Sequence, residues 1–156
     1  MSEGPHIYVD ADACPVKADA VKVADRHDLA VTFVTNAWLQ APRGRRVRTQ
    51  VVSGAFDAAD DWIVEQVKPD DIVVTADIPL ASRCLKLRAR VLGPAGKPFT
   101  DDNIGNALAT RELMADLRAY GVGGGPPPFD ARDRSRFLQA LELAVCAACR
   151  SRSNVS

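Results

Sequence analysis

Aspartates directly follow two apolar segments of this sequence. Asp10 and Asp12 end the first segment in IYVDADACP, and Asp77 follows the apolar run IVVT. Asn36 stands in the same position after another apolar segment, VTFVT. Side-chain oxygens are the ligands that Mg²⁺ and Mn²⁺ prefer, whereas Zn²⁺ and copper favour nitrogen and sulfur. These residue types therefore indicate divalent-metal chemistry, provided that the fold brings them together.

A second acidic group lies in the segment FDAADDW. On a helix, Asp57, Asp60 and Asp61 share one face, because they are three and four residues apart. If the helix begins near Asp10 and Asp77, several carboxylates meet in a small volume and repel one another strongly. A bound cation would relieve that repulsion. The predicted metal ligands are Asp10, Asp12, Asp57, Asp60 and Asp77.

Short β-branched runs alternate with helical patterns, which predicts an α/β fold with three α/β/α layers and a mainly parallel sheet of about five strands. Strands are expected at residues 6–9, 30–35, 47–52, 71–75 and 89–92. Helices are expected at residues 16–26, 57–66, 78–87, 100–120 and 131–149. Residues 1–150 are predicted to form a single domain, with a linker at 121–129 and a disordered tail at 151–156.

The predicted fold places only some of the aspartates where a ligand would bind, because ligands of parallel α/β sheets bind at the carboxyl ends of the strands. Asp10 and Asp77 follow their strands and should share that edge with Asp12 and Asn36. In contrast, Asp70 and Asp71 precede their strand, so we expect them at the opposite edge as turn formers.

Helix capping is the alternative explanation for single aspartates of this set. Asp12, Asp57 and Asp77 each stand where a helix N-cap would stand, and Pro15 and Pro79 fit the first turns that follow. Capping alone does not explain why so many carboxylates gather at one edge, since Asp10 belongs to the strand itself. The metal site is therefore an inference from the whole set.

Five stretches of the sequence resemble the bacterial YaiI/YqxD family, which is assigned to the PIN-like nuclease fold. They are IYVDADACPVK, GAFDAADDWI, DIVVTADIPLA, FTDDNIGNALATRELM and GGGPPPFDARDRSRF, in the order of the family. The resemblance implies a central first strand, with the second and third strands on one side of it. It also implies acidic site residues at Asp10, at Asp57 or Asp60, and at Asp77, with Asp12 as an addition of this family. The fourth acidic residue of PIN-like nucleases has no obvious counterpart after Asp77.

The resulting hypothesis is a metal-dependent phosphodiesterase that acts on RNA or DNA. Its catalytic residues would be Asp10, Asp12, Asp60 and Asp77, which would hold Mg²⁺ or Mn²⁺ and orient an activated water molecule. The predicted substrate-binding residues are Lys17, Asn36, Asn103 and Arg111. Two of these have structural alternatives, since Asn103 could cap its helix beside Thr100 and Arg111 could pair with Glu112 or with a nearby aspartate.

Two other functions remain open. DADACPV and VTFVTN resemble motifs of haloacid-dehalogenase-like phosphatases, although the usual Gly-Thr after the second aspartate is missing. Alternatively, the chain is an inactive RNA- or metal-binding module that contacts phosphates through RGRRVR, residues 43–48, or through Arg134 and Arg136. The CxxC of Cys146 and Cys149 lacks the second pair that a structural zinc site requires.

Composition limits the possible partners and compartments. Twenty basic residues balance 20 acidic ones, so the chain has no overall positive charge for coating nucleic acid. No leader and no long apolar run is present, which predicts a cytoplasmic protein that does not cross a membrane. Four scattered cysteines are then expected to be free thiols.

Overall fold

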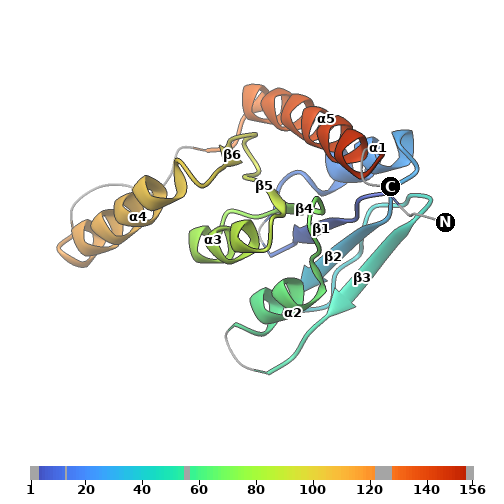
Figure 1. The fold of residues 1–156 in the computed structure, drawn as a ribbon. Coiled ribbons are helices and arrows are strands. Elements are labelled where there is room, and N and C mark those ends of the chain that lie inside the picture. Colours follow the sequence, from blue (N-terminus) through green and yellow to red (C-terminus); the bar gives the residue numbers. More distant parts are fainter. Residues whose placement is uncertain (1–3, 13, 55–56, 122–127, 154–156) are drawn as a thin grey trace.

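A computed structural model describes residues 4–12, 14–54, 57–121 and 128–153 of the chain (Figure 1). Its sheet has the strand order β3-β2-β1-β4-β5-β6, in which β5 and β6 are antiparallel and all other neighbours are parallel. The strands are β1 (Ile7–Asp10), β2 (Val31–Thr35), β3 (Val47–Val51), β4 (Ile72–Val74), β5 (Arg90–Leu92) and β6 (Pro98–Phe99). The mainly parallel sheet and the central position of β1 are confirmed. The short sixth strand was not predicted.

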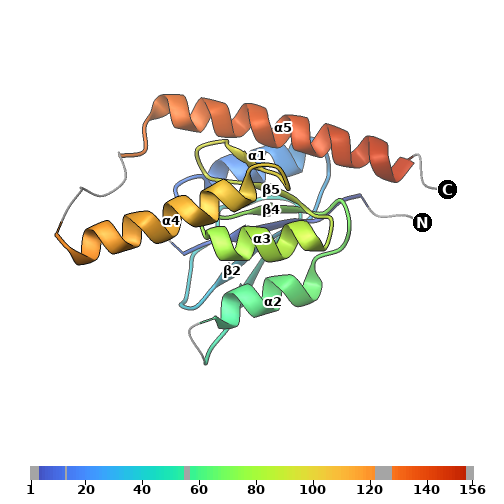
Figure 2. The same ribbon diagram turned by 60° about the vertical axis from the view of Figure 1, so that its left-hand side comes forward.

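Helices cover both faces of the sheet, which gives the three predicted layers (Figures 1 and 2). One face carries α1 (Lys17–Arg26) and α5 (Ala131–Ser153), and the other carries α2 (Ala58–Gln66) and α3 (Ile78–Lys86). The fifth helix, α4 (Ile104–Ala119), packs its first turns against α3 and then extends beyond the sheet. α4 contains no fully buried residue.

The alternation of side chains along the strands divides the core into two clusters. Ile7 and Val9 of β1 point toward α1 and α5, whereas Tyr8, between them, points toward α2 and α3. α5 completes the first cluster with a buried stripe at helical spacing, formed by Phe137, Leu141, Val145 and Ala148. Asp10 lies two residues after Tyr8, so the same alternation directs it to the α2 side.

The beginning of α5 is fixed against the turn between β5 and β6. Gly96 in that turn has a φ of +89°, and a Cβ atom there would lie 2.5 Å from the backbone carbon of Arg136. Only glycine fits this close approach without strain. The turn therefore holds the amino-terminal part of α5 against the sheet edge.

Two predicted boundaries change by four residues, whereas the others agree within one residue. The last helix continues to Ser153, so residues 151–153 are helical rather than part of a disordered tail, and residues 154–156 lie outside the described residues. Helix α4 begins at Ile104, four residues later than predicted, because Asn103 and Thr100 bond each other in the preceding turn. Most of the predicted linker, residues 122–127, also lies outside the described part.

The four cysteines, all among the described residues, are free thiols as predicted. Among the described helices, none combines the length and the apolar character that crossing a membrane demands.

Candidate functional site

A small pocket opens at the carboxyl edge of the sheet, where β1, β2 and β4 end. Its volume is about 180 Å³. It is lined by Asp10, Asp12, Asn36, Ala59, Asp60 and Asp77. Five of the residues predicted from the sequence therefore surround one space, although they come from four separate segments. We call this the acidic pocket.

Asp10 is the last residue of β1 and lies at the base of the acidic pocket. The Thr75 hydroxyl donates a hydrogen bond of 2.8 Å to Asp10 Oδ2. Burial raises the pKa of Asp10, the charges of Asp12 and Asp77 raise it further, and the bond from Thr75 opposes the shift. Asp10 is thus a carboxylate held in place in an environment that disfavours its charge.

Asp12 is oriented by the end of the neighbouring strand β2. Thr35 Oγ1 donates to Asp12 Oδ1 at 2.9 Å, and Asn36 Nδ2 donates to Asp12 Oδ2 at 3.2 Å. Thr35 is buried, with 4% of its surface exposed. Asn36, predicted to bind substrate, therefore also positions a carboxylate of the acidic pocket.

Asp77 caps helix α3. Its Oδ1 accepts a hydrogen bond of 2.9 Å from the backbone N–H of Leu80, and proline occupies the first turn that follows. The backbone N–H of Asp77 donates to Thr75 Oγ1, also at 2.9 Å. The capping alternative is confirmed for Asp77, and the same residue also lines the acidic pocket.

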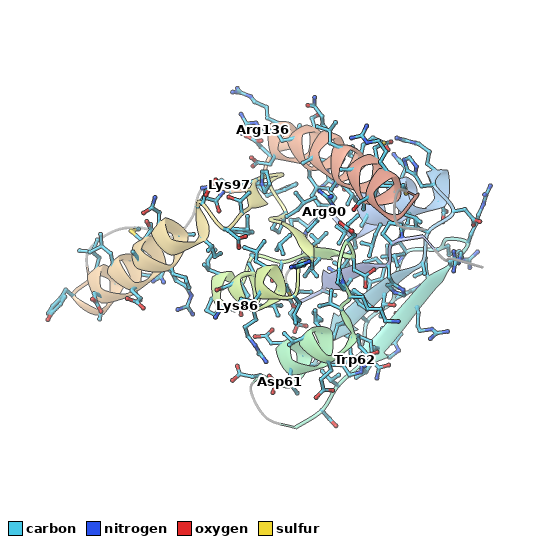
Figure 3. All side chains as sticks on the ribbon, viewed as in Figure 1. Asp61, Trp62, Lys86, Arg90, Lys97 and Arg136 are labelled. Atoms are coloured by element: carbon cyan, nitrogen blue, oxygen red, sulfur yellow. The ribbon has the colours of Figure 1, made fainter. Side chains whose placement is uncertain are left out.

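Helix α2 contributes Asp60, whose carboxylate accepts no hydrogen bond from the described part of the chain that would stabilise its negative charge. Asp60 forms no side-chain hydrogen bond with another described residue, and Asp57 at the N-cap makes none to the helix backbone. Desolvation, followed by the charges of Asp77, Asp10 and Asp57, raises the pKa of Asp60 to about 6. The neighbouring Asp61 points outward and pairs with Arg83 at 2.9 Å (Figure 3). Of the acidic face of α2, Asp60 is the residue that lines the acidic pocket.

Two threonines that the sequence analysis missed connect these aspartates. Thr75 is 1% exposed and bridges Asp10 and Asp77, while Thr35 holds Asp12. Thr35 is the last residue of β2 and directly precedes Asn36, whereas Thr75 directly follows β4 and stands two residues before Asp77. A threonine in that position is the sequence signal that could have identified them.

The predicted substrate residues divide between two places. Asn36 lines the acidic pocket, whereas Lys17 is not one of its lining residues and donates from its ammonium group to the Cys14 carbonyl at 2.7 Å. Asn103 and Arg111 instead line a separate pocket of about 470 Å³ between α3, α4 and β6. Asn103 is the N-cap residue of α4, but its Oδ1 accepts from the Thr100 N–H at 2.9 Å in the preceding turn and makes no bond to the helix backbone, so side-chain capping of α4 by Asn103 is not confirmed. These two residues and the aspartates do not line the same pocket.

The spacing of the aspartates is wider than that of a closed metal site. Within the described ranges, the one set of three histidine, cysteine or acidic residues with ligand atoms less than 4.8 Å apart is His27, Glu142 and Cys146. It lies between α1 and α5, away from the acidic pocket. Desolvation by burial disfavours the charged form of Glu142, but hydrogen bonds from His27 and Arg26 outweigh it and lower the pKa of Glu142. One ion bound by all four pocket aspartates would therefore draw their side chains closer together.

Comparisons with known proteins place these residues in a family. The family model described as "Uncharacterized BCR, YaiI/YqxD family" matches residues 8–147. A UPF0178 protein of Rhodopseudomonas palustris is 53% identical over 148 residues, which cover 94% of each chain. A UPF0178 protein of Paramagnetospirillum magneticum is 57% identical over 145 residues, or 92% of this chain and 96% of the relative. No solved structure matches the chain.

Proposed function

The chain belongs to the uncharacterised YaiI/YqxD family, and from its own residues we propose that it hydrolyses phosphodiester bonds of RNA or DNA with Mg²⁺ or Mn²⁺ in the acidic pocket. The observation that carries this proposal is the convergence of Asp10, Asp12, Asp60 and Asp77 on one pocket. A cytoplasmic location, predicted from the sequence, accords with such a substrate.

The donor set fits a hard divalent cation. All side-chain donors that line the acidic pocket carry oxygen, and Asn36 adds an amide. Burial, followed by repulsion from Asp77, Asp10 and Asp57, raises the pKa of Asp60 to about 6, and a bound cation would offset this cost of the charged form. Asp10, Asp60 and Asp77 would hold the ion, since each retains carboxylate oxygen capacity beyond its described hydrogen bonds.

The ion would supply positive charge for a bound phosphate and make a water molecule more acidic. Thr75 keeps Asp10 and Asp77 at a fixed separation, because it bonds both. Thr35 and Asn36 fix Asp12, and Asp57 adds negative charge beside Asp60. Lys17, the first residue of α1, would supply a cation for the substrate phosphate. These contacts preorganise the site before substrate arrives.

The test is cleavage of labelled single-stranded RNA and DNA in Mn²⁺ or Mg²⁺. We expect Asp10→Asn and Asp77→Asn to lower the rate at least about 100-fold, because metal-assisted charge stabilisation contributes several kcal/mol. Asp116→Asn on exposed α4 is the matched control, since it removes one negative charge outside the pocket. Equal rates in all three variants would refute the proposed site.

The same samples separate the two alternatives from this proposal. A haloacid-dehalogenase-like phosphatase would release phosphate from monoesters and form an acyl-phosphate on Asp10. An inactive binding module would retain RNA in a salt-dependent manner and leave it intact in Mn²⁺. Either result would overturn the phosphodiesterase proposal while keeping the fold assignment.

A further inference from the structure

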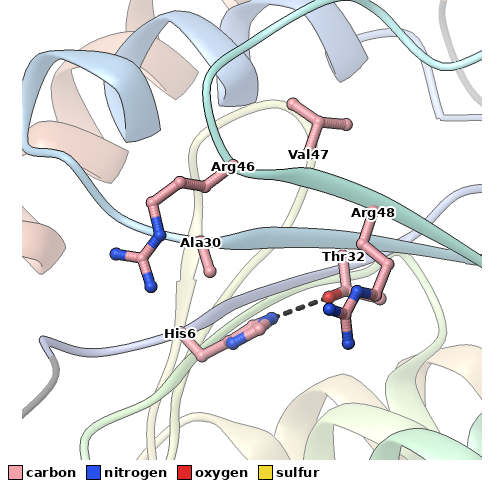
Figure 4. Close-up of a pocket in the computed structure, with 6 residues that line it drawn as sticks. All are labelled: His6, Ala30, Thr32, Arg46, Val47 and Arg48. Atoms are coloured by element: carbon pink, nitrogen blue, oxygen red, sulfur yellow. Dashed lines mark hydrogen bonds between the residues drawn. The ribbon is translucent and has the colours of Figure 1, made fainter.

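A second polar pocket lies at the opposite, amino-terminal edge of the sheet. Its volume is about 390 Å³ (Figure 4). It is lined by His6, Ala30, Thr32, Arg46, Val47 and Arg48. We call it the basic pocket. Both of its arginines belong to RGRRVR, the basic segment that does not contribute to the acidic pocket.

Strand register explains why these side chains meet. Tyr8 pairs with Thr32 and Thr32 with Arg48, so Thr32 and Arg48 are neighbours on the same face of the sheet. His6, Ala30 and Arg46 stand two residues earlier in the chain, each directly before its strand, and the alternation continued from the strand directs them to that same face. Figure 4 shows the two guanidinium groups on either side of the His6 ring, all on one side of the strands.

The pocket's side chains are held by contacts with its own walls. His6 Nε2 lies 2.7 Å from Thr32 Oγ1, and the His6 ring stacks on Tyr8 with centroids 4.3 Å apart. Arg46 Nη1 donates to the Asp28 carbonyl at 2.9 Å. Arg48 forms no salt bridge with any carboxylate in the described ranges. Its guanidinium group is therefore available to a ligand.

One acid beside the pocket, Asp71, is bonded to backbone donors. Asp71 lies behind His6, is 3% exposed, and accepts backbone N–H bonds of 3.0 Å from His6 and 2.9 Å from Lys68. Its negative charge is thus compensated by backbone dipoles below the pocket. Arg48, which is exposed and forms no salt bridge with a described residue, therefore supplies positive charge at the opening.

We propose that the basic pocket binds a phosphate group. A guanidinium group presents a planar set of N–H donors that matches phosphate oxygens, and two such groups on opposite sides suit a tetrahedral anion better than a flat one. The volume also lies in the range of small-molecule sites, which leaves room for a group attached to the phosphate.

This site is independent of the acidic pocket. His6 and Asp10 are four residues apart on one strand, or about 13 Å at the rise of an extended chain. The two pockets share no lining residue. The phosphate could come from a small nucleotide or from a nucleic-acid backbone, and the experiment is designed to distinguish these sources.

The experiment follows amide and arginine side-chain signals of the ¹⁵N-labelled protein during titration with inorganic phosphate, a nucleoside monophosphate and a short single-stranded oligonucleotide. We expect saturable shifts at His6, Thr32 and Arg48. Arg48→Gln should weaken phosphate binding about tenfold or more, the equivalent of one lost charge-assisted hydrogen bond. Arg43→Gln is the control, because it removes the same charge from the same segment outside the pocket lining.

Each outcome decides the proposal. If Arg48→Gln weakens all three ligands, the pocket binds nucleic-acid backbone. If it weakens phosphate and nucleotide but not the oligonucleotide, the pocket serves small phosphorylated compounds. Absence of saturable shifts in the wild-type protein, or equal weakening by Arg43→Gln, would overturn the site. The Asp10→Asn protein should bind phosphate normally, so failure of the phosphodiesterase proposal leaves this test intact.

Discussion

Aspartates at the two edges of the sheet have opposite surroundings. At the amino-terminal edge, both oxygens of Asp71 accept backbone N–H bonds from His6 and Lys68. At the carboxyl edge, Asp60 has no such donor, and three other aspartates surround the same pocket. Asp70 and Asp71 were predicted to form turns, and the bond from the Asp71 N–H to the Lys68 carbonyl confirms that role.

The comparison shows what distinguishes a structural carboxylate from a candidate functional one. Asp71 is more deeply buried than Asp60, yet its charge is matched by backbone donors. Asp60 is only partly buried, yet desolvation and the charges of Asp77, Asp10 and Asp57 raise its pKa to about 6 against the opposing charge of Arg83. Burial alone therefore does not identify the site. The site is identified by which hydrogen-bond donors and charged groups surround each carboxylate.

The largest expected effect is the stabilisation of the protein by a metal ion bound at the carboxyl edge. At an Mn²⁺ concentration about 100 times the Kd, binding should add about 2.7 kcal/mol and raise the wild-type Tm by about 5–10 °C. Asp77→Asn should lose this increase while remaining folded, because asparagine is also a good N-cap for α3.

The control for metal stabilisation is Cys146→Ser, which alters the alternative cluster of His27 and Glu142. This variant should keep the full Mn²⁺ effect. If Cys146→Ser loses the increase and Asp77→Asn keeps it, the ion binds between α1 and α5 and the acidic pocket is not the metal site.

A smaller effect is expected at the opposite edge. Asp71→Asn places an amide NH₂ against one of two buried backbone donors and should cost about 1–3 kcal/mol in the free energy of unfolding. Urea unfolding at pH 7.5 would measure this. The Mn²⁺ increment should be unchanged in Asp71→Asn, and a loss of metal stabilisation there would contradict the separation of the two edges.

The smallest effect is expected for Asp60→Asn, which should raise the free energy of unfolding instead of lowering it. The pKa of Asp60 is raised from its ordinary value of 3.8 to about 6, so the stability that its neutral form contributes is complete below about pH 3.8 and is lost as the pH rises through about 6. Metal-free Asp60→Asn should therefore be more stable than wild type at pH 7.5, by less than about 1 kcal/mol because the group is partly solvated.

Thermal unfolding in chelator at pH 7.5 and pH 4 would measure this difference. The advantage of Asp60→Asn should shrink below pH 6 and disappear near pH 4, where Asp60 of the wild type is itself neutral. A variant that is less stable than wild type at pH 7.5 would show that Asp60 is compensated by its neighbours, as Asp71 is.

The sequence determined the architecture and the edge of the sheet to which most candidate residues belong. Apolar runs such as IVVT and helical spacing in DAADDW are local signals, and the position of Asp10 and Asp77 after their strands follows from chain direction alone. The same reasoning placed Asp71 at the other edge. The two-residue strand β6 was missed because Pro98–Phe99 is too short to show any periodicity.

Only the tertiary structure decided which neighbours each polar group has. The bonds from Thr75 to Asp10, 65 residues apart, and from Thr35 to Asp12 depend on strands that pair across the sheet. The assignment of Asn103 and Arg111 to a separate pocket depends on how α4 leaves the sheet. Sequence patterns report the direction and exposure of single elements, whereas charge compensation depends on distances between elements, which the packing of the whole chain sets.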